Sequence, residues 1–207
     1  MSELALILLA LVAAAPARAA GSPCGSTAEC LAAIEQAQRD TQTLQARFEQ
    51  VKRVQLLEQP LVSRGRFAFK RPDRVRLEVT EPQPATLLIR GTEVRIPGVS
   101  EADAHAMAMT PTAAMFSRLG ALFTGQTRAL EQDFTVSARA DGTAVEVSLT
   151  PRQERWQKVL RRIELRFSGP QLLAEKIRID DSLGDELEIT MLDVQRNVEL
   201  PDSLFEP

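Results

Sequence analysis

Apolar and polar residues alternate with a period of two over most of the chain. The alternation is found in residues 44–48, 62–69, 74–79, 86–90, 93–96, 134–138, 145–149, 163–167, 177–179 and 187–191. A period of two is typical of β-strands that bury one face only. Turn residues such as Asp141–Gly142 and Ser168–Pro170 separate these runs. The pattern predicts an antiparallel sheet with one apolar face and one face toward water.

Near the start, residues 26–40 have the period of a helix instead. Ser26 or Thr27 can cap the helix, and Leu31 and Ile34 recur at helical spacing on one side. We expect the helix to end near Asp40.

A second helix is expected in the middle of the chain. Thr110–Pro111 is a favourable helix start, and Thr124–Gly125 is a favourable end. One face of this helix would carry Met115, Phe116, Leu119, Leu122 and Phe123. Such a stripe indicates either ordinary core packing or a movable lid over the sheet. Strands and helices do not alternate, so the sequence predicts a mainly β, α+β fold in one domain over residues 21–207.

The N-terminus resembles a secretory signal peptide. Leu4–Ala15 is an unbroken apolar run, followed by small residues that end near Ala19 or Ala20. The run is shorter than the roughly 20 residues that span a bilayer. We therefore expect residues 1–20 to be a cleaved signal peptide and the protein to be periplasmic. Glu3 precedes the run where a basic residue is usual, and an uncleaved anchor is the alternative.

Composition excludes several function classes. The net charge is −3 and tyrosine is absent, so neither a basic patch nor a base-stacking surface for nucleic acid is indicated. The sequence contains no Gly-x-Ser-x-Gly motif and no phosphate-binding loop. Its single histidine, His105, is not accompanied by an evident nucleophile. We expect no enzyme activity, no metal site and no cofactor.

Cys24 and Cys30 are the two cysteines of the chain. In an oxidising compartment they can form a small disulfide loop. On one regular helix, residues six apart project to opposite faces, so a bridge requires Cys24 to precede the helix. Two free thiols are the alternative.

By alternation, Arg71 falls on the same face as the apolar residues that precede it. Phe67, Phe69 and Arg71 share one face by alternation, and Pro72 follows. A buried guanidinium must find acceptors, because it does not lose its charge. Arg71 therefore either binds carbonyls or a carboxylate beside an apolar cavity or lies in an ordinary exposed turn.

Trp156 is the only tryptophan, and basic residues surround it in the sequence. Two interpretations are open: the ring closes one end of the core, or it contacts a membrane surface or a partner.

Several segments in order resemble one family. They are Leu44–Gln50, Gly65–Leu77 with its Arg71–Pro72 turn, Pro82, Leu87–Gly91, residues 119–125 and 149–151, Gly184, and residues 197–207. Together they resemble the bacterial outer-membrane lipoprotein carriers, the LolA-like proteins, over about residues 31–207.

The resemblance implies an open, incomplete antiparallel β-barrel with helices that lid its concave apolar face. Acyl chains of lipoproteins, or of a related lipid, would bind there after handover from an inner-membrane ABC-transporter complex and then pass to an outer-membrane acceptor. Arg71 falls on the arginine that holds the lid helices closed when the cavity is empty. The cavity is expected to be lined by Phe48, Phe67, Phe69, Val75, Leu77, Leu87, Ile89, Met115, Phe116, Leu119 and Phe123.

The resulting hypothesis is a monomeric, non-enzymatic periplasmic carrier. A lipid-sensing or protein-interaction module on the same fold is the alternative, and an enzyme that uses His105 is a third possibility. The two hypotheses can be distinguished by the structure, because the carrier requires an apolar cavity beside the sheet.

Overall fold

The computed structural model describes residues 23–91, 93–98 and 130–206. The expected signal peptide, the expected helix over residues 110–123 and His105 lie outside these ranges, as do the cavity residues Met115, Phe116, Leu119 and Phe123. The described elements are α1 (Thr27–Gln38), β1 (Thr43–Arg53), β2 (Leu61–Lys70), β3 (Arg74–Glu81), β4 (Ala85–Arg90), β5 (Glu93–Arg95), β6 (Phe134–Asp141), β7 (Ala144–Pro151), α5 (Glu154–Gln157), β8 (Leu160–Ser168), β9 (Leu173–Asp181), β10 (Glu186–Arg196) and η1 (Asp202–Phe205).

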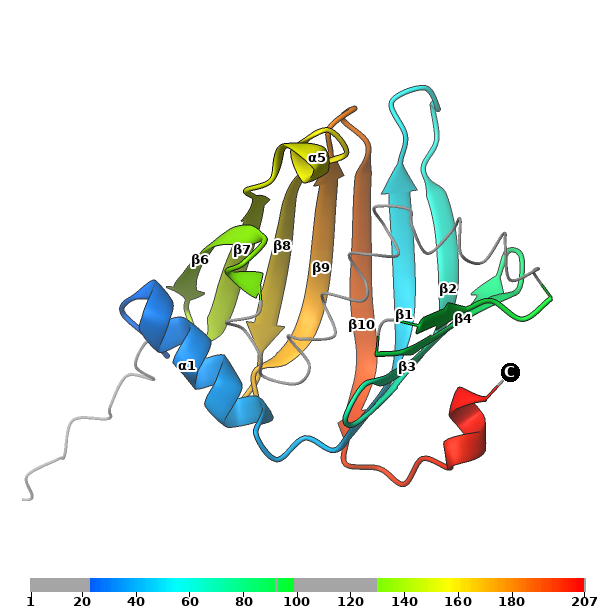
Figure 1. The fold of residues 1–207 in the computed structure, drawn as a ribbon, viewed down its shortest axis with the longest axis horizontal. Helices are drawn as coiled ribbons and strands as arrows, with labels where there is room; N and C mark the ends of the chain where they lie inside the picture. Colours follow the sequence, from blue (N-terminus) through cyan, green and yellow to red (C-terminus); the bar gives the residue numbers. More distant parts are fainter. Residues whose placement is uncertain (1–22, 92, 99–129, 207) are drawn as a thin grey trace, which may run out of the picture.

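The strands form one antiparallel sheet. Its order is β5-β4-β3-β2-β1-β10-β9-β8-β7-β6, so β5 and β6 are the two edges and the described sheet is open. Pairing of β1 with β10 joins the two halves of the chain at the centre. Strand direction changes markedly between β6–β9 and β3–β4 (Figure 1), as expected when twist accumulates over many strands. The predicted mainly β, open antiparallel fold is confirmed.

The register places the alternating residues on two distinct faces. Ala46, Phe67, Leu77 and Leu87 are successive partners across β1–β4 and form one apolar row. The adjacent row on the opposite face consists of the polar residues Arg47, Arg66, Glu78 and Thr86.

The core lies on the apolar face, mostly over β7–β9. There Val147, Leu165 and Ile177 are cross-strand partners and are at most 4% exposed. Leu31 and Ile34 of α1 belong to the same buried cluster. Figure 1 shows α1 running across the lower ends of β6–β9. Helix α1 therefore covers part of the apolar face at this end of the sheet.

Ion pairs cross the polar face of the same strands. Arg166 of β8 bonds Asp141 at 2.6 Å and Glu146 at 2.9 Å. The hydrogen bond and charge of Arg166 lower the pKa of Asp141. Opposite charges on neighbouring strands satisfy one another at the surface, so this face needs no covering layer.

Candidate functional site

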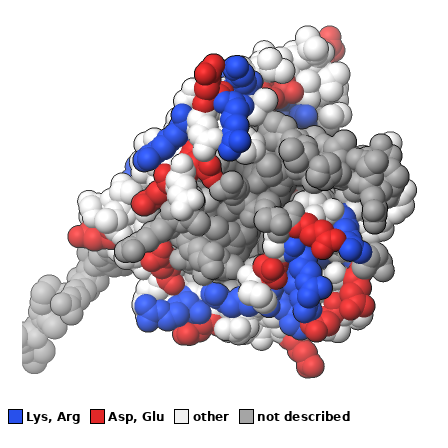
Figure 2. All heavy atoms as spheres, in the orientation of Figure 1, with Lys and Arg blue, Asp and Glu red and all other residues white. Residues whose placement is uncertain are grey.

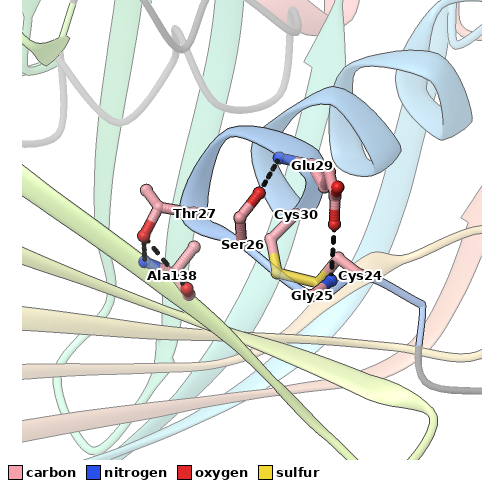
Figure 3. The surroundings of a disulfide bond; sticks show 7 residues. All are labelled: Cys24, Gly25, Ser26, Thr27, Glu29, Cys30 and Ala138. Atoms are coloured by element: carbon pink, nitrogen blue, oxygen red, sulfur yellow. Dashed lines mark hydrogen bonds between the residues drawn. A yellow bond between two sulfur atoms is a disulfide. The ribbon is translucent and has the colours of Figure 1, made fainter.

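Helix α1 is anchored at its N-terminus by a capped, disulfide-bonded turn (Figure 3). Ser26 Oγ accepts a hydrogen bond from the Glu29 amide at 3.3 Å. Glu29 Oε2 accepts one from the Gly25 amide at 2.7 Å. A disulfide joins Cys24, which precedes the helix, to Cys30 inside it. The bond closes the first turn of the helix against the buried cluster, in which Cys30 is 1% exposed.

Thr27 attaches this turn to the sheet edge. Its hydroxyl accepts a hydrogen bond from the Ala138 amide at 3.1 Å and donates one to the Ala138 carbonyl at 3.2 Å. Both backbone groups belong to the edge strand β6. Unpaired edge groups can pair with other chains, so Thr27 covers a point where the edge is vulnerable. Of the two candidate caps predicted from the sequence, Ser26 and Thr27, Ser26 is the one that caps the helix.

Arg71 binds the other end of α1 from the turn between β2 and β3. Its Nε donates to the Thr41 carbonyl at 2.5 Å, and its Nη2 donates to the carbonyls of Gln38 at 3.1 Å and Arg39 at 3.4 Å. The last carbonyls of a helix lack partners within it and carry partial negative charge. A guanidinium suits this place because it supplies several donors and a permanent positive charge.

Two further residues bind the same helix end from β10 and the segment after it. Arg196 Nη1 donates to the Ala37 carbonyl at 2.9 Å. Asn197 Nδ2 donates to the Asp40 carbonyl at 3.0 Å. Within the helix, Gln38 Nε2 donates to the Leu172 carbonyl, between β8 and β9, at 2.7 Å. Two arginines and an asparagine, from the β2–β3 turn and the end of β10, therefore meet at one helix terminus, which also reaches a backbone carbonyl between β8 and β9.

Sequence reasoning missed Arg196 and Asn197. Each lies more than 150 residues from its partner along the chain, and β10 shows only the alternation of a strand there. The one available signal was the resemblance, which began its closing segment at Asn197.

The expected cavity residues in the described range all lie on the apolar face, but their burial differs. Phe48, Phe67, Phe69 and Ile89 are at most 7% exposed. Val75, Leu77 and Leu87 are half-buried. Among the expected lining residues in the described range, these half-buried residues of β3 and β4 are the most available to an apolar ligand.

Gly65 was quoted in the family resemblance without a role of its own, and it shapes the same face. A Cβ on Gly65 would lie 2.6 Å from Cζ of Phe48, its partner across β1 and β2. The absence of a side chain lets the Phe48 ring lie over the strand.

A C-terminal segment, residues 200–206, packs on the polar face of β2–β4. Lys70 Nζ donates to the Leu200 carbonyl at 2.8 Å and to Asp202 at 2.6 Å. Arg74 reaches the same carboxylate at 2.9 Å, and Arg76 donates to the Leu204 carbonyl. The hydrogen bonds from Lys70 and Arg74 lower the pKa of Asp202. We call residues 200–206 the C-terminal strap.

Within the described part of the chain, no three His, Cys, Asp or Glu side chains are grouped to hold a metal ion. The helices described there are also too short or too polar to cross a membrane. The described site therefore consists of an apolar sheet face and helix α1, which is fastened across part of it.

Comparison with known proteins matches one family along most of the chain. The sequence profile described as "Outer membrane lipoprotein carrier protein LolA" matches residues 39–207. An outer-membrane lipoprotein carrier protein of Dechloromonas aromatica (strain RCB) is 29% identical over 171 residues, which are 81% of this chain and 77% of that protein.

Among solved structures, a LolA superfamily protein from Nitrosomonas europaea matches with a TM-score of 0.48 and 13% identity, over 89% of this chain and 99% of that one. The complex of MucA and MucB from Pseudomonas aeruginosa matches with a TM-score of 0.48 and 14% identity, over 87% of this chain and 60% of that one. The profile match alone spans well over half of the sequence, and it shows that this chain belongs to the LolA family of outer-membrane lipoprotein carrier proteins.

Proposed function

We propose that this protein is a periplasmic carrier that shields the acyl chains of lipoproteins, or of a related lipid, against the apolar face of its sheet. Cargo would arrive from an inner-membrane ABC-transporter complex and leave to an outer-membrane acceptor. The observation that carries the proposal is the open sheet with half-buried Val75, Leu77 and Leu87 on its apolar face. Family membership supports the class of cargo.

Burial of an acyl chain supplies the binding energy. Each methylene removed from water contributes about 0.8 kcal/mol, so a chain of roughly twelve methylenes gains on the order of 10 kcal/mol. A carrier must also release its cargo. An opposing interaction that forms only in the empty state lowers the net affinity and permits handover.

Arg71 is the residue we assign to that opposing interaction. Its three hydrogen bonds reach the carbonyls of Gln38, Arg39 and Thr41. Hydrogen bonds to a charged group contribute about 1.5–3 kcal/mol each after the exchange with water is counted. Cargo that displaces α1 would break them, and their reformation would favour the empty state.

The test compares the mature protein with Arg71→Leu and a matched control, Arg64→Leu. Arg64 lies in β2, the strand that leads to Arg71, but on the polar face, where it pairs with Glu49 and Glu81. Each protein is purified from a periplasm, checked by circular dichroism, extracted with organic solvent and analysed by mass spectrometry for bound lipid and lipoprotein.

We expect acylated cargo in all three proteins, with about tenfold more retained by Arg71→Leu than by Arg64→Leu. Equal retention by the two variants would remove the assigned role of Arg71. If no protein contains acylated cargo and none binds an added acylated peptide, the carrier proposal fails, and an interaction module on the same fold becomes the better explanation.

A further inference from the structure

Asn197 binds the connection between α1 and β1 with both ends of its side-chain amide. Its Oδ1 accepts a hydrogen bond from the Gln42 amide at 2.7 Å, and its Nδ2 donates to the Asp40 carbonyl at 3.0 Å. Its own backbone amide donates to the Thr43 carbonyl at 2.9 Å. An asparagine side chain carries both a donor and an acceptor group. Both groups are engaged here, on a stretch of backbone that is neither helix nor strand.

The backbone of Asn197 does not by itself explain an asparagine at this position. Its φ is 57°, in the left-handed region, which asparagine and glycine adopt most readily. A glycine would therefore satisfy the backbone equally well. Asn197 is also exposed, so its side chain fills no space in the core. The contacts of the side-chain amide with Asp40 and Gln42 are what an asparagine adds at this position.

Arg71 binds the same connection from the other side of β1. The two neighbours of β1 in the sheet are β2 and β10. Arg71 directly follows β2, and Asn197 directly follows β10. The Arg71 backbone amide donates to the Gln42 carbonyl at 2.8 Å, in addition to the hydrogen bonds of the guanidinium. Figure 1 shows the connection entering β1 at the lower edge of the sheet, beside the end of β10. The start of β1 is therefore held on both sides.

The acceptors of the two sides alternate along the backbone, and every carbonyl from residue 37 to residue 43 has a donor among them. Arg71 binds the carbonyls of Gln38, Arg39, Thr41 and Gln42. Arg196 and Asn197 bind the carbonyls of Ala37, Asp40 and Thr43. Neither side therefore binds this backbone independently of the other.

One peptide unit of the connection is held between Asn197 and Arg71. The Thr41 carbonyl and the Gln42 amide belong to the same planar trans unit, so they point in opposite directions. Asn197 accepts from the Gln42 amide at one end of the unit. Arg71 Nε donates to the Thr41 carbonyl at the other end, at 2.5 Å. The direction of the carbonyl that Arg71 binds therefore depends on the contact that Asn197 makes.

The segment after Asn197 fixes its place relative to β2. Thr43 Oγ1 donates to the Val198 carbonyl at 2.6 Å. Lys70, which precedes Arg71, donates to the Leu200 carbonyl at 2.8 Å. Figure 2 shows basic and acidic side chains side by side over the lower right of the molecule, the part that contains β3 and the C-terminal strap. The strap therefore ties the chain after Asn197 to the strand that leads to Arg71.

We propose that Asn197 is a positioning residue for Arg71. By binding the Gln42 amide, it presents the Thr41 carbonyl to the guanidinium. By binding the Asp40 carbonyl, it fixes the connection next to the helix end that supplies the other acceptors. Without the Asn197 side chain, the acceptors of Arg71 are no longer held in place, and α1 opens more readily. The consequence for cargo release rests on the proposed function, whereas the consequence for α1 does not.

The test measures native-state hydrogen exchange at the α1 amides of the mature protein, with the β8 amides as the internal reference. Asn197→Gly removes the side chain and suits the left-handed backbone. Asp193→Gly is the matched control, because Asp193 also has a left-handed φ, of 53°, and its exposed side chain bonds Arg47 at the surface. Arg71→Leu and the Asn197→Gly/Arg71→Leu double variant complete the set.

We expect the α1 amides of Asn197→Gly to exchange about fivefold faster than those of wild type, as the loss of exposed hydrogen bonds implies. Asp193→Gly should match wild type in α1, and the β8 amides should keep the wild-type rate in both glycine variants. Arg71→Leu should also accelerate exchange in α1. The double variant should be no faster than Arg71→Leu alone, because a positioning residue acts only through the residue that it positions.

Each of the following results would overturn the proposal. Wild-type exchange in α1 of Asn197→Gly would show that Arg71 does not need this side chain. Accelerations that multiply in the double variant would show that Asn197 and Arg71 act independently. Equal acceleration of the α1 and β8 amides, or the same acceleration in Asp193→Gly, would assign Asn197 a general structural role.

Cargo retention tests the consequence for release separately. Purified from a periplasm, Asn197→Gly should retain about fivefold more acylated cargo than Asp193→Gly, in line with the weaker hold on α1. Equal retention by these two variants, while Arg71→Leu retains more, would remove Asn197 from the release step. If wild type and all variants lack acylated cargo, the carrier proposal fails, and hydrogen exchange still decides whether Asn197 positions Arg71.

Discussion

On the apolar face, β7–β9 and β3–β4 are packed to different extents, although both groups of strands show the same alternation in sequence. Val147, Leu165 and Phe167 are between 1% and 2% exposed, in the region that also contains the buried residues of α1. Val75 and Leu87 remain half-buried. Because the first region is closely packed, even a small change in the volume of its side chains is costly. The second region retains the apolar surface that a ligand can use.

On the polar face, it is the β2–β4 region that is covered by another segment of the chain. Over β7–β9, ion pairs such as Arg166 with Glu146 join neighbouring strands across this face. Over β2–β4, the C-terminal strap lies on the sheet, and Leu88 on that face is only 5% exposed. The strap thus supports β3 and β4 from behind, where the apolar side is less filled. One half is stabilised mainly by its core, and the other depends more on a peripheral segment.

The largest expected effect comes from deleting the same side chain in each half. Leu165→Ala removes a leucine that is 2% exposed, and we expect it to lower the free energy of unfolding by about 2–5 kcal/mol. Leu87→Ala, at a half-buried position, should cost about 1 kcal/mol. Urea unfolding at pH 7 measures both, and equal losses would contradict the distinction between the two halves.

A smaller effect is expected from removing the disulfide that anchors α1. Cys24 and Cys30 are six residues apart, and closing so short a loop lowers the entropy of the unfolded chain by an amount worth about 2 kcal/mol. The Cys24→Ser/Cys30→Ser variant should therefore unfold at lower urea concentration. Reductant provides the control, because it should destabilise wild type and leave the variant unchanged. A variant as stable as oxidised wild type would show that α1 does not depend on this bond.

The smallest expected effect concerns the strap and pH. Lys70 first, and then Arg74, lower the pKa of Asp202 in the folded protein. The contribution of Asp202 to stability is therefore fully present above the ordinary aspartate value of about 3.9 and is lost as pH falls through the lower, folded-state value. Nuclear magnetic resonance titration of the Asp202 carboxyl should show this depressed pKa.

Asp202→Asn is the matched variant for that titration. It should remove the part of the pH dependence that belongs to the strap, and hydrogen exchange should become faster in η1 before it does in β8. An ordinary pKa for Asp202, or unchanged exchange in η1, would argue against the supporting role of the strap.

Much of the sheet could be predicted from the sequence because strand alternation is local. Each predicted run in the described residues coincides with a strand, and Phe67, Leu77 and Leu87 were correctly placed on the apolar face. The cap at Ser26 was one of two options, and the structure selected it. Arg71 was singled out because alternation places its charged side chain on the apolar face, where it needs hydrogen-bond acceptors. Alternation could not identify which acceptors it binds.

The sequence by itself determined the strand periodicity, the start of α1 and the one-sided apolar character, since these depend on residues a few positions apart. Only the tertiary structure decided that Arg71, Arg196 and Asn197 meet at one helix end, that Phe48 requires Gly65 beside it, and that Gln55 bonds to Gly184 in the β9–β10 turn. Those contacts join segments brought together by pairing of β1 with its neighbours β2 and β10. The relative position of distant strands follows from the register and twist of the whole sheet, which no local pattern encodes.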